Sequence, residues 1–274
     1  MKDLLHYILI LTVLALTMVG LQSCSSDDLH NEDDAQVCFT VSLPADTHTR
    51  SFGKAEQVNT LVVGIFNEQK SEVGRKKMAI TGSSIDVNFS LAQNQTYSFV
   101  FWAYDSSLNI YNIDNLTAIE MNSLPNAVTF AQAEAMDAFF AIEKDITITK
   151  NSSHTVELIR PLAQINVGTT AAQIQATFKA KSVPNTFYPF TNTVSGAADY
   201  TWKFNETTAE TFTTEYKQYK YLALGYVFAP TVATNISAEL TLTDGINNKT
   251  LEFPQIKIEA NQRTNIAGNF TATN

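Results

Sequence analysis

The chain has 274 residues, is 45% hydrophobic and carries a formal net charge of −9 at pH 7. This length and apolar content are enough for one large core or for two domains. The acidic balance, in which Arg75-Lys76-Lys77 is the one tight basic cluster, argues against a nucleic-acid-binding protein.

The N-terminal residues have the pattern of a bacterial export signal. Lys2 supplies a positive charge, residues 4–21 form a long apolar stretch, and Ser23 leads directly to Cys24. A secretory signal has this charged start, apolar middle and small-residue cleavage site. A cysteine at the cleavage point resembles the lipobox of bacterial lipoproteins, which implies a signal peptide over residues 1–23 and acylation of Cys24, for example by palmitate. The alternative is an N-terminal transmembrane helix, because the apolar stretch approaches the roughly 20 residues that span a bilayer.

Residues 24–35 are predicted to form an acidic tether. The first 50 residues contain two basic and seven acidic residues, so they hold −5 of the net charge of −9. An acidic run that also contains serine is typically solvated. Directly after a lipidated cysteine, it also resembles the signal that sends some lipoproteins to the outer cell surface. We therefore expect the lipid on Cys24 to hold the protein at the outer membrane, because several acyl chains anchor essentially permanently.

From Gln36 onward, apolar and polar residues alternate with a period of two. Such alternation places every second side chain on one face of a strand, as a half-buried antiparallel sheet requires. The clearest runs are 36–43, 85–91, 174–180 and 236–242, and further strands are expected at 61–66, 97–104, 146–149, 155–167, 221–228, 250–258 and 264–270. The core positions of the first run are Val37, Phe39, Val41 and Leu43. Cys38 lies between them and is predicted to be a small strand residue rather than a nucleophile.

The many short strands predict an all-β fold. In about 220 residues the default is one or two β-sandwiches. Pro161 interrupts a long extended stretch and leaves about 110 residues on each side, a typical sandwich size. We therefore expect an N-terminal β-sandwich over residues 36–160 and a C-terminal one over residues 161–274. Residues 130–142 stay unassigned, because their composition favours a helix whereas Phe139-Phe140 could begin a strand.

Residues that could carry catalysis are sparse. The histidines are His6, His30, His48 and His154, and no two have a metal-ligand spacing. His154 follows a polar segment and is predicted to be a solvated loop residue rather than a general base. There is no Cys-x-x-Cys, no Gly-x-Ser-x-Gly and no phosphate-binding glycine loop. We therefore expect no enzyme activity, no metal and no cofactor, with an envelope hydrolase that uses paired carboxylates as a third-ranked class.

Trp102 and Trp202 could stack on sugars if they were exposed. Trp102 lies in a run that is apolar or aromatic on both faces, and Trp202 alternates with polar neighbours. Both are therefore predicted to be core residues. The alternative function is that of a monomeric surface lipoprotein that binds glycan or a host protein. Such a protein would keep the strand at 36–43 and expose aromatic side chains at a loop end of the sandwich.

Short motifs are spread over nearly the whole chain. They are the lipobox at Cys24, Phe101-Trp102-Ala103, residues 160–167, Tyr221-Leu222-Ala223 and Arg263-Thr264-Asn265-Ile266. Together they resemble the fimbrillin-like lipoproteins, which build type V pili. The resemblance implies two tandem transthyretin-like β-sandwich domains, export as a lipoprotein, and removal of an N-terminal segment by an arginine-specific surface protease. It also implies a location in a cell-surface fimbrium, in which subunits join by donor-strand exchange.

Arg50 is the arginine at which such a protease would release the first strand. It is the only arginine before Arg75 and lies in a polar stretch. A cut between Arg50 and Ser51 would remove residues 36–43 from the core. Unpaired strand edges then recruit a new strand, with roughly 2 kcal/mol for each apolar side chain that is buried again. The simpler interpretation is that Arg50 is an ordinary loop residue and the chain keeps its first strand.

Two further features concern assembly. Arg160 lies in an apolar stretch, so it is either paired with a buried carboxylate or placed at the domain junction, in a structural role. Few residues follow the last expected strand at 264–270, so a subunit that donates its own C-terminal strand would have to release this one. The sequence therefore leaves open whether the chain is a stalk, tip or accessory subunit, with other fimbrial subunits as partners.

Overall fold

The computed structural model describes residues 34–44, 57–125, 127–171 and 174–273. Most of them lie in β-strands, with one short α-helix among them, so the predicted all-β sandwich fold is confirmed. No helix in this part of the chain is long and apolar enough to cross a membrane. Cys24, Arg50 and Ser51, together with the signal peptide and most of the tether, lie outside the described residues.

The described elements are long strands, a few short strands and one short helix. In the first half they are β1 (Asp34–Ser42), β2 (Thr60–Phe66), β3 (Glu72–Ala79), β4 (Ser84–Ala92), β5 (Thr96–Tyr104), β6 (Tyr111–Asn112), β7 (Ile119–Met121), α2 (Phe130–Glu134), β8 (Ala138–Thr147) and β9 (Ser152–Glu157). In the second half they are β10 (Leu162–Thr169), β11 (Gln175–Val183), β12 (Thr186–Tyr188), β13 (Thr193–Ser195), β14 (Ala198–Trp202), β15 (Thr211–Thr213), β16 (Gln218–Phe228), β17 (Thr234–Thr243), β18 (Asn248–Ile258) and β19 (Arg263–Gly268).

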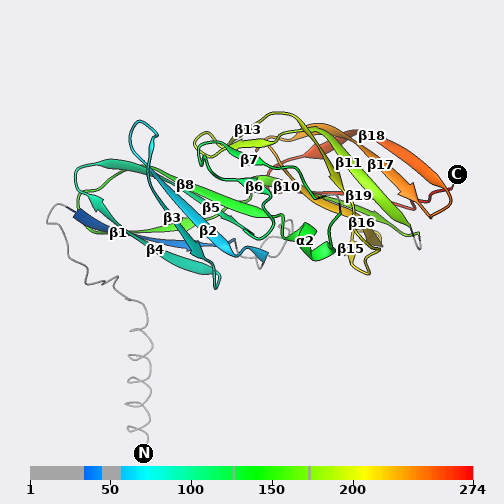
Figure 1. Cartoon of the computed structure of the whole chain (residues 1–274), viewed down its shortest axis with the longest axis horizontal. Coiled ribbons are helices and arrows are strands. Elements are labelled where there is room, and N and C mark those ends of the chain that lie inside the picture. Colours follow the sequence, from blue (N-terminus) through cyan, green and yellow to red (C-terminus); the bar gives the residue numbers. More distant parts are fainter. Residues whose placement is uncertain (1–33, 45–56, 126, 172–173, 274) are drawn as a thin grey trace, which may run out of the picture.

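The first sandwich lies on the left of Figure 1 and has a core of its own. One of its sheets has the strand order β4-β1-β9 and the other has the order β3-β2-β5-β8. Alternate residues of the two sheets meet in one apolar cluster, whose members all lie between residues 35 and 158. The rings of Phe39, Phe99, Phe101 and Phe139 are its largest buried groups. The alternation of apolar and polar residues therefore places one face of the strands in this core, as predicted.

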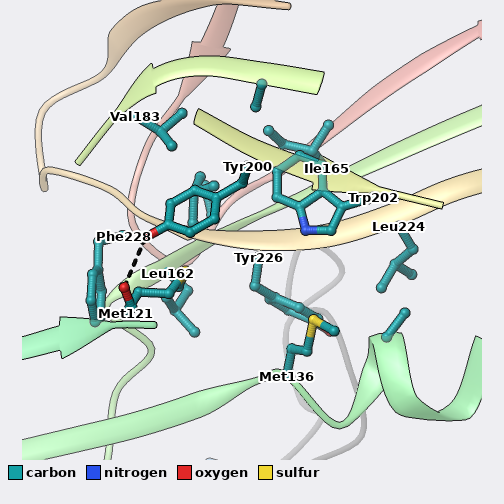
Figure 2. Close-up of a cluster of buried hydrophobic side chains, with 14 of the residues drawn as sticks. Met121, Met136, Leu162, Ile165, Val183, Tyr200, Trp202, Leu224, Tyr226 and Phe228 are labelled. Carbon is teal, nitrogen blue, oxygen red and sulfur yellow. Dashed lines mark hydrogen bonds between the residues drawn. The ribbon is translucent and has the colours of Figure 1, made fainter. Parts of the chain in front are cut away.

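The second sandwich is built from the sheets β15-β16-β10-β19 and β14-β11-β17-β18. Trp202 of β14 lies against Gly225 of β16, where a Cβ atom would lie 2.0 Å from the indole ring. The same indole stacks on Phe178 of β11, with ring centroids 5.6 Å apart. Figure 2 shows this region, including the hydrogen bond that the Tyr200 hydroxyl donates to the Met121 carbonyl at 3.0 Å. Glycine is thus needed at position 225 for the two sheets to approach.

A smaller sheet connects the two halves of the chain. Strands β6 and β7 precede α2, whereas β12 and β13 follow β11, and the four form the sheet β13-β12-β7-β6. Trp102 of β5 packs near Phe187 of β12 and Phe228 of β16, with ring centroids 6.1 and 6.3 Å apart. The outer face of the β3-β2-β5-β8 sheet therefore contributes to the second apolar core. The boundary between residues 160 and 161 stays a prediction.

The strand expected over residues 155–167 is two strands. β9 ends at Glu157 and β10 begins at Leu162, because Pro161 has no N–H to donate to a sheet. His154 lies within β9 and its ring stacks on Phe39 at 5.1 Å, so the prediction of a loop position for His154 is wrong. An exposed edge strand with alternating polar residues resembles a loop in composition.

Residues 130–142 contain both of the structures that their composition allowed. Thr129 caps α2 in a capping box with Gln132, which satisfies backbone N–H groups at the helix start. The helix ends at Glu134, and β8 begins at Ala138. Strand β3 was not expected, because it carries the basic cluster 75–77 and lies at a sheet edge, where charged residues discourage pairing with other chains.

Candidate functional site

Strand β1 lies in the middle of its sheet. It pairs with β4 in the antiparallel sense over its whole length and with β9 in the parallel sense from Val37 onward. Among the described strands, β4 and β9 have no other sheet partner. β1 is therefore the strand that joins β4 and β9 into one sheet.

The apolar side chains of β1 fill the first core. Val37 and Phe39 are 0% exposed and Val41 is 2% exposed, whereas Leu43 is partly buried at the edge of the same cluster. The Phe39 ring contacts Phe99, with centroids 4.6 Å apart. Full burial of such a side chain stabilises by about 1.5–3 kcal/mol. The three fully buried residues thus contribute about 5–9 kcal/mol, comparable to the net stability of a typical domain.

The chain between β1 and β2 contains the predicted cleavage site. Leu43 is still held by a hydrogen bond from its N–H to the Ser83 carbonyl at 3.0 Å. Residues 45–56, and with them Arg50 and Ser51, are not among the described residues. Access of a protease to Arg50 therefore stays a prediction.

The second sandwich repeats the surroundings of β1. Strand β10 pairs with β16 in the antiparallel sense and with β19 in the parallel sense, just as β1 pairs with β4 and β9. In both sandwiches the first strand is central in its sheet. The first sandwich differs because its central strand, β1, is the first strand of the described fold. A single cut between β1 and β2 would therefore separate β1 from the rest of the chain.

Strand β19 belongs to the fold of its own chain. It follows β10 from Arg263 to Gly268, two residues short of the expected end. Beyond it, the N–H of Phe270 donates to the Thr169 hydroxyl, and that hydroxyl donates to the Phe270 carbonyl, both at 3.0 Å. Lys249 reaches the Thr273 carbonyl at 3.4 Å. Donation of β19 to another subunit would break these contacts.

A buried ion pair lies where α2, β8 and β10 meet. Arg160 is 3% exposed and Asp137 is 2% exposed. The guanidinium donates from Nε and Nη2 to the Asp137 carboxylate at 2.7 Å each, and it lies over the Phe139 ring at 4.8 Å. Arg160 also donates to Asn261 at 3.1 Å. Of the two roles expected for Arg160, the pairing with a buried carboxylate is thus observed.

Glu134 at the end of α2 extends this buried polar group. Gln164 of β10 donates to its Oε1 atom at 3.3 Å. Burial, followed by the charge of Asp137, raises the pKa of Glu134 to about 7, although the cations of Arg160 and Arg263 oppose the shift. A carboxyl group that titrates near neutrality therefore lies against the second sandwich.

Sequence reasoning missed Asp137 and Glu134. A signal was present, because Asp137 is the single charge in the apolar stretch 135–141, as Arg160 is in its own. Two isolated opposite charges in apolar segments are expected to pair. No sequence pattern indicates that Glu134 lies near them.

The side chains considered for sugar stacking or catalysis do not form a site. Trp102 and Trp202 are 0% and 2% exposed, so both are core residues as predicted. Cys38 is buried on β1. Among the described residues, no cluster of His, Cys, Asp or Glu could hold a metal ion.

Solved structures share this two-sandwich fold. A "putative adhesin" from Bacteroides thetaiotaomicron is 14% identical, with a TM-score of 0.54 over 83% of this chain and 82% of that one. "Putative polysaccharide binding proteins (DUF1812)" from the same species give 8% identity and a TM-score of 0.51, with 80% of each chain covered. A "putative cell adhesion protein" from Bacteroides eggerthii gives 15% identity and a TM-score of 0.50, with 89% of each chain covered. At such identities the likeness establishes the fold alone.

The sequence itself places the chain in a family. Residues 30–274 match the family of unknown function DUF6562, and the chain belongs to it. No curated protein matches the sequence.

Proposed function

We propose that the protein is a structural subunit of a cell-surface fimbrium, exported as a lipoprotein and joined to other subunits by exchange of strand β1. It acts by assembly rather than by catalysis. The observation that carries this proposal is the position of β1, which is central in its sheet, fully buried on one face and first in the described fold. Removal of such a strand leaves a groove that another strand can fill.

The groove left by β1 would be both apolar and rich in unpaired backbone groups. Its floor would expose Phe99 and Phe101, which now contact Phe39. The facing edges of β4 and β9 would lose their hydrogen-bonding partner. Exposed strand edges of this kind template the addition of a new strand, so the cut subunit is expected to bind a strand from a neighbour.

The backbone of the groove accepts a strand in either direction. β1 is antiparallel to β4 and parallel to β9, so those two strands run opposite to each other. An incoming strand of either sense would again have one parallel and one antiparallel neighbour. Side chains at the positions of Val37, Phe39 and Val41 would therefore select the incoming strand and its register.

Further support comes from the sequence motifs and from the shared fold. The motif set resembles that of fimbrillin-like lipoproteins. The solved structures of the same fold include two described as a "putative adhesin". Lipid attachment at Cys24 and cleavage between Arg50 and Ser51 belong to the same proposal. They would place the subunit at the outer surface before the strand is released.

Limited proteolysis followed by native mass spectrometry tests the proposal. The soluble chain beginning at Ser25 contains every described residue and is treated with an arginine-specific protease. We expect a cut after Arg50, followed by non-covalent oligomers. Arg50→Lys is the matched control, because it keeps the positive charge but removes the cleavage site, and it should remain a monomer.

A competing peptide separates strand exchange from aggregation. A synthetic peptide of residues 36–43, added in excess to the cut chain, should refill the groove and return the oligomers to a one-to-one complex. Oligomers that ignore the peptide would indicate non-specific association. A cut chain that stays a folded monomer without the peptide would contradict the proposal itself.

A further inference from the structure

A cleft opens at the end of the first sandwich where β1 begins. Its volume is about 380 Å³, within the range of about 300–1,000 Å³ typical of small-molecule sites. The β2–β3 turn lies on one side and the β4–β5 turn on the other. Ala92 in its wall is the residue that faces Asp34 at the start of β1.

The floor of the cleft is apolar and aromatic. Ile65, Leu91 and Tyr97 line it and belong to, or pack against, the first core. Val73 also lines it and is 54% exposed. A surface formed by an aromatic ring and exposed aliphatic groups can pack against the C–H face of a ligand.

The rim of the cleft carries polar side chains with no partner in the described chain. The carboxylate of Glu68 and the amides of Gln69 and Gln95 line the cleft and are exposed, and none of the three forms a side-chain hydrogen bond with another described residue. Ser90, also in the lining, bonds Asp34 at 3.3 Å. Polar residues from both turns therefore line the same cleft.

Both turns are held in place by their own hydrogen bonds. The Asn67 side chain accepts from the N–H groups of Gln69 and Ser71 at 3.1 and 3.0 Å. In the other turn, Asn94 donates from its N–H to the Ile148 carbonyl at 2.6 Å, and Ile148 donates to the Gln95 carbonyl at 2.9 Å. The backbone of both turns is thus fixed before any ligand arrives, so only the exposed side chains have to be ordered on binding.

We propose that this cleft binds a neutral saccharide, with one sugar ring packed on Tyr97 and Val73 and its hydroxyl groups bonded to Glu68, Gln69 and Gln95. A pyranose ring combines an apolar C–H face with hydroxyls that both donate and accept, which matches this floor and rim. No Arg or Lys lines the cleft, whereas recognition of sulfate, phosphate or carboxylate groups relies on such cations. The lining therefore favours an uncharged sugar.

The site is independent of strand exchange. It is formed in the uncut chain with β1 in place, so it can be tested without proteolysis. Failure of strand exchange would leave this proposal standing, and failure of sugar binding would leave the fimbrial proposal standing.

Ligand-observed saturation-transfer NMR on the uncut chain beginning at Ser25 tests the site. The probes are the methyl glycosides of glucose, galactose, mannose and N-acetylglucosamine, with a peptide of residues 36–43 as the non-sugar arm. We expect at least one glycoside to bind with a dissociation constant on the order of 1 mM, as suits a ligand of one ring. The peptide should not compete with it.

Variants locate the binding. Gln95→Ala changes an exposed side chain and should weaken binding several-fold, whereas Tyr97→Ala should weaken it at least about tenfold. Gln93→Ala is the matched control, because Gln93 is in the same turn but does not line the cleft. Tyr97→Phe keeps the ring and should retain binding, which guards against a folding defect in the alanine variant.

Three results would overturn the proposal. The first is no saturation transfer from any glycoside at about 20 mM, well above the expected dissociation constant. The second is binding that Gln95→Ala and Tyr97→Ala leave unchanged, which would place the sugar elsewhere. The third is displacement of the sugar by the peptide, which would identify the cleft as a strand-docking surface.

Discussion

Glu134 offers a test of the buried polar group through the pH dependence of stability. Its pKa is raised from 4.5 to about 7, first by burial and then by the charge of Asp137. The folded protein therefore favours the protonated carboxyl group. The stabilising contribution of that proton is complete below about pH 4.5 and is lost as the pH rises toward 7.

The size of the effect follows from the pKa change. A change of one pKa unit corresponds to about 1.4 kcal/mol, so the shift corresponds to about 3 kcal/mol. Because Glu134 is only partly buried, solvent screening reduces the expected value to about 2 kcal/mol. Glu134→Gln removes the titration but keeps a side chain of the same shape. The variant should therefore gain about 2 kcal/mol relative to the native chain between pH 4.5 and pH 8.

Urea unfolding of the native chain and the variant at several pH values measures this difference. Contributions of the other titrating groups cancel in the comparison, except where they interact with Glu134. Those groups are Asp137, Arg160, Arg263 and Glu210. A constant difference for Glu134→Gln, or one that favours the native chain as the pH rises, would refute the reasoning.

Three further substitutions test the packing. Phe39→Ala should destabilise the chain by about 3–5 kcal/mol, because it empties the centre of the first core, and a loss below about 1 kcal/mol in urea unfolding would contradict that position. Arg160→Ala should cost about 3–5 kcal/mol by leaving Asp137 buried without its cation, and the double variant with Asp137→Ala should recover part of that loss in a double-mutant cycle. Gly225→Ala should lower the thermal midpoint, since its Cβ atom would meet the Trp202 ring at 2.0 Å, whereas Gly82→Ala, which has its nearest neighbour at 4.0 Å, should be close to neutral.

The local pattern was enough to identify most long strands and their buried faces. In β1, alternation alone selects Val37, Phe39 and Val41, and the structure places all three in the core. Such a pattern is readable because side chains alternate between the two faces of any strand, whatever its partner is. Both tryptophans are likewise predictable as core, since large aromatic residues among apolar neighbours are most stable when buried.

The alternation pattern could not predict which strands pair with each other when they are distant in the sequence. Alternation does not say that β1 pairs with β9, which begins more than a hundred residues later in the chain. It also missed β3, whose charged residues sit on an edge strand. The choice of neighbour depends on which faces complement each other once the whole chain has collapsed, and many pairings satisfy the same local alternation.

The sequence by itself determined the all-β class and the buried face of β1, and it left two roles open for Arg160. Only the tertiary structure decided that Arg160 pairs with Asp137, that Glu134 lies near the pair, and that two turns border the cleft beside Tyr97. The physical reason is the range of the interactions. Side-chain alternation and helix capping act between neighbours in the chain, whereas ion pairing, burial of a carboxyl group and the shape of a cleft depend on segments that folding alone brings together.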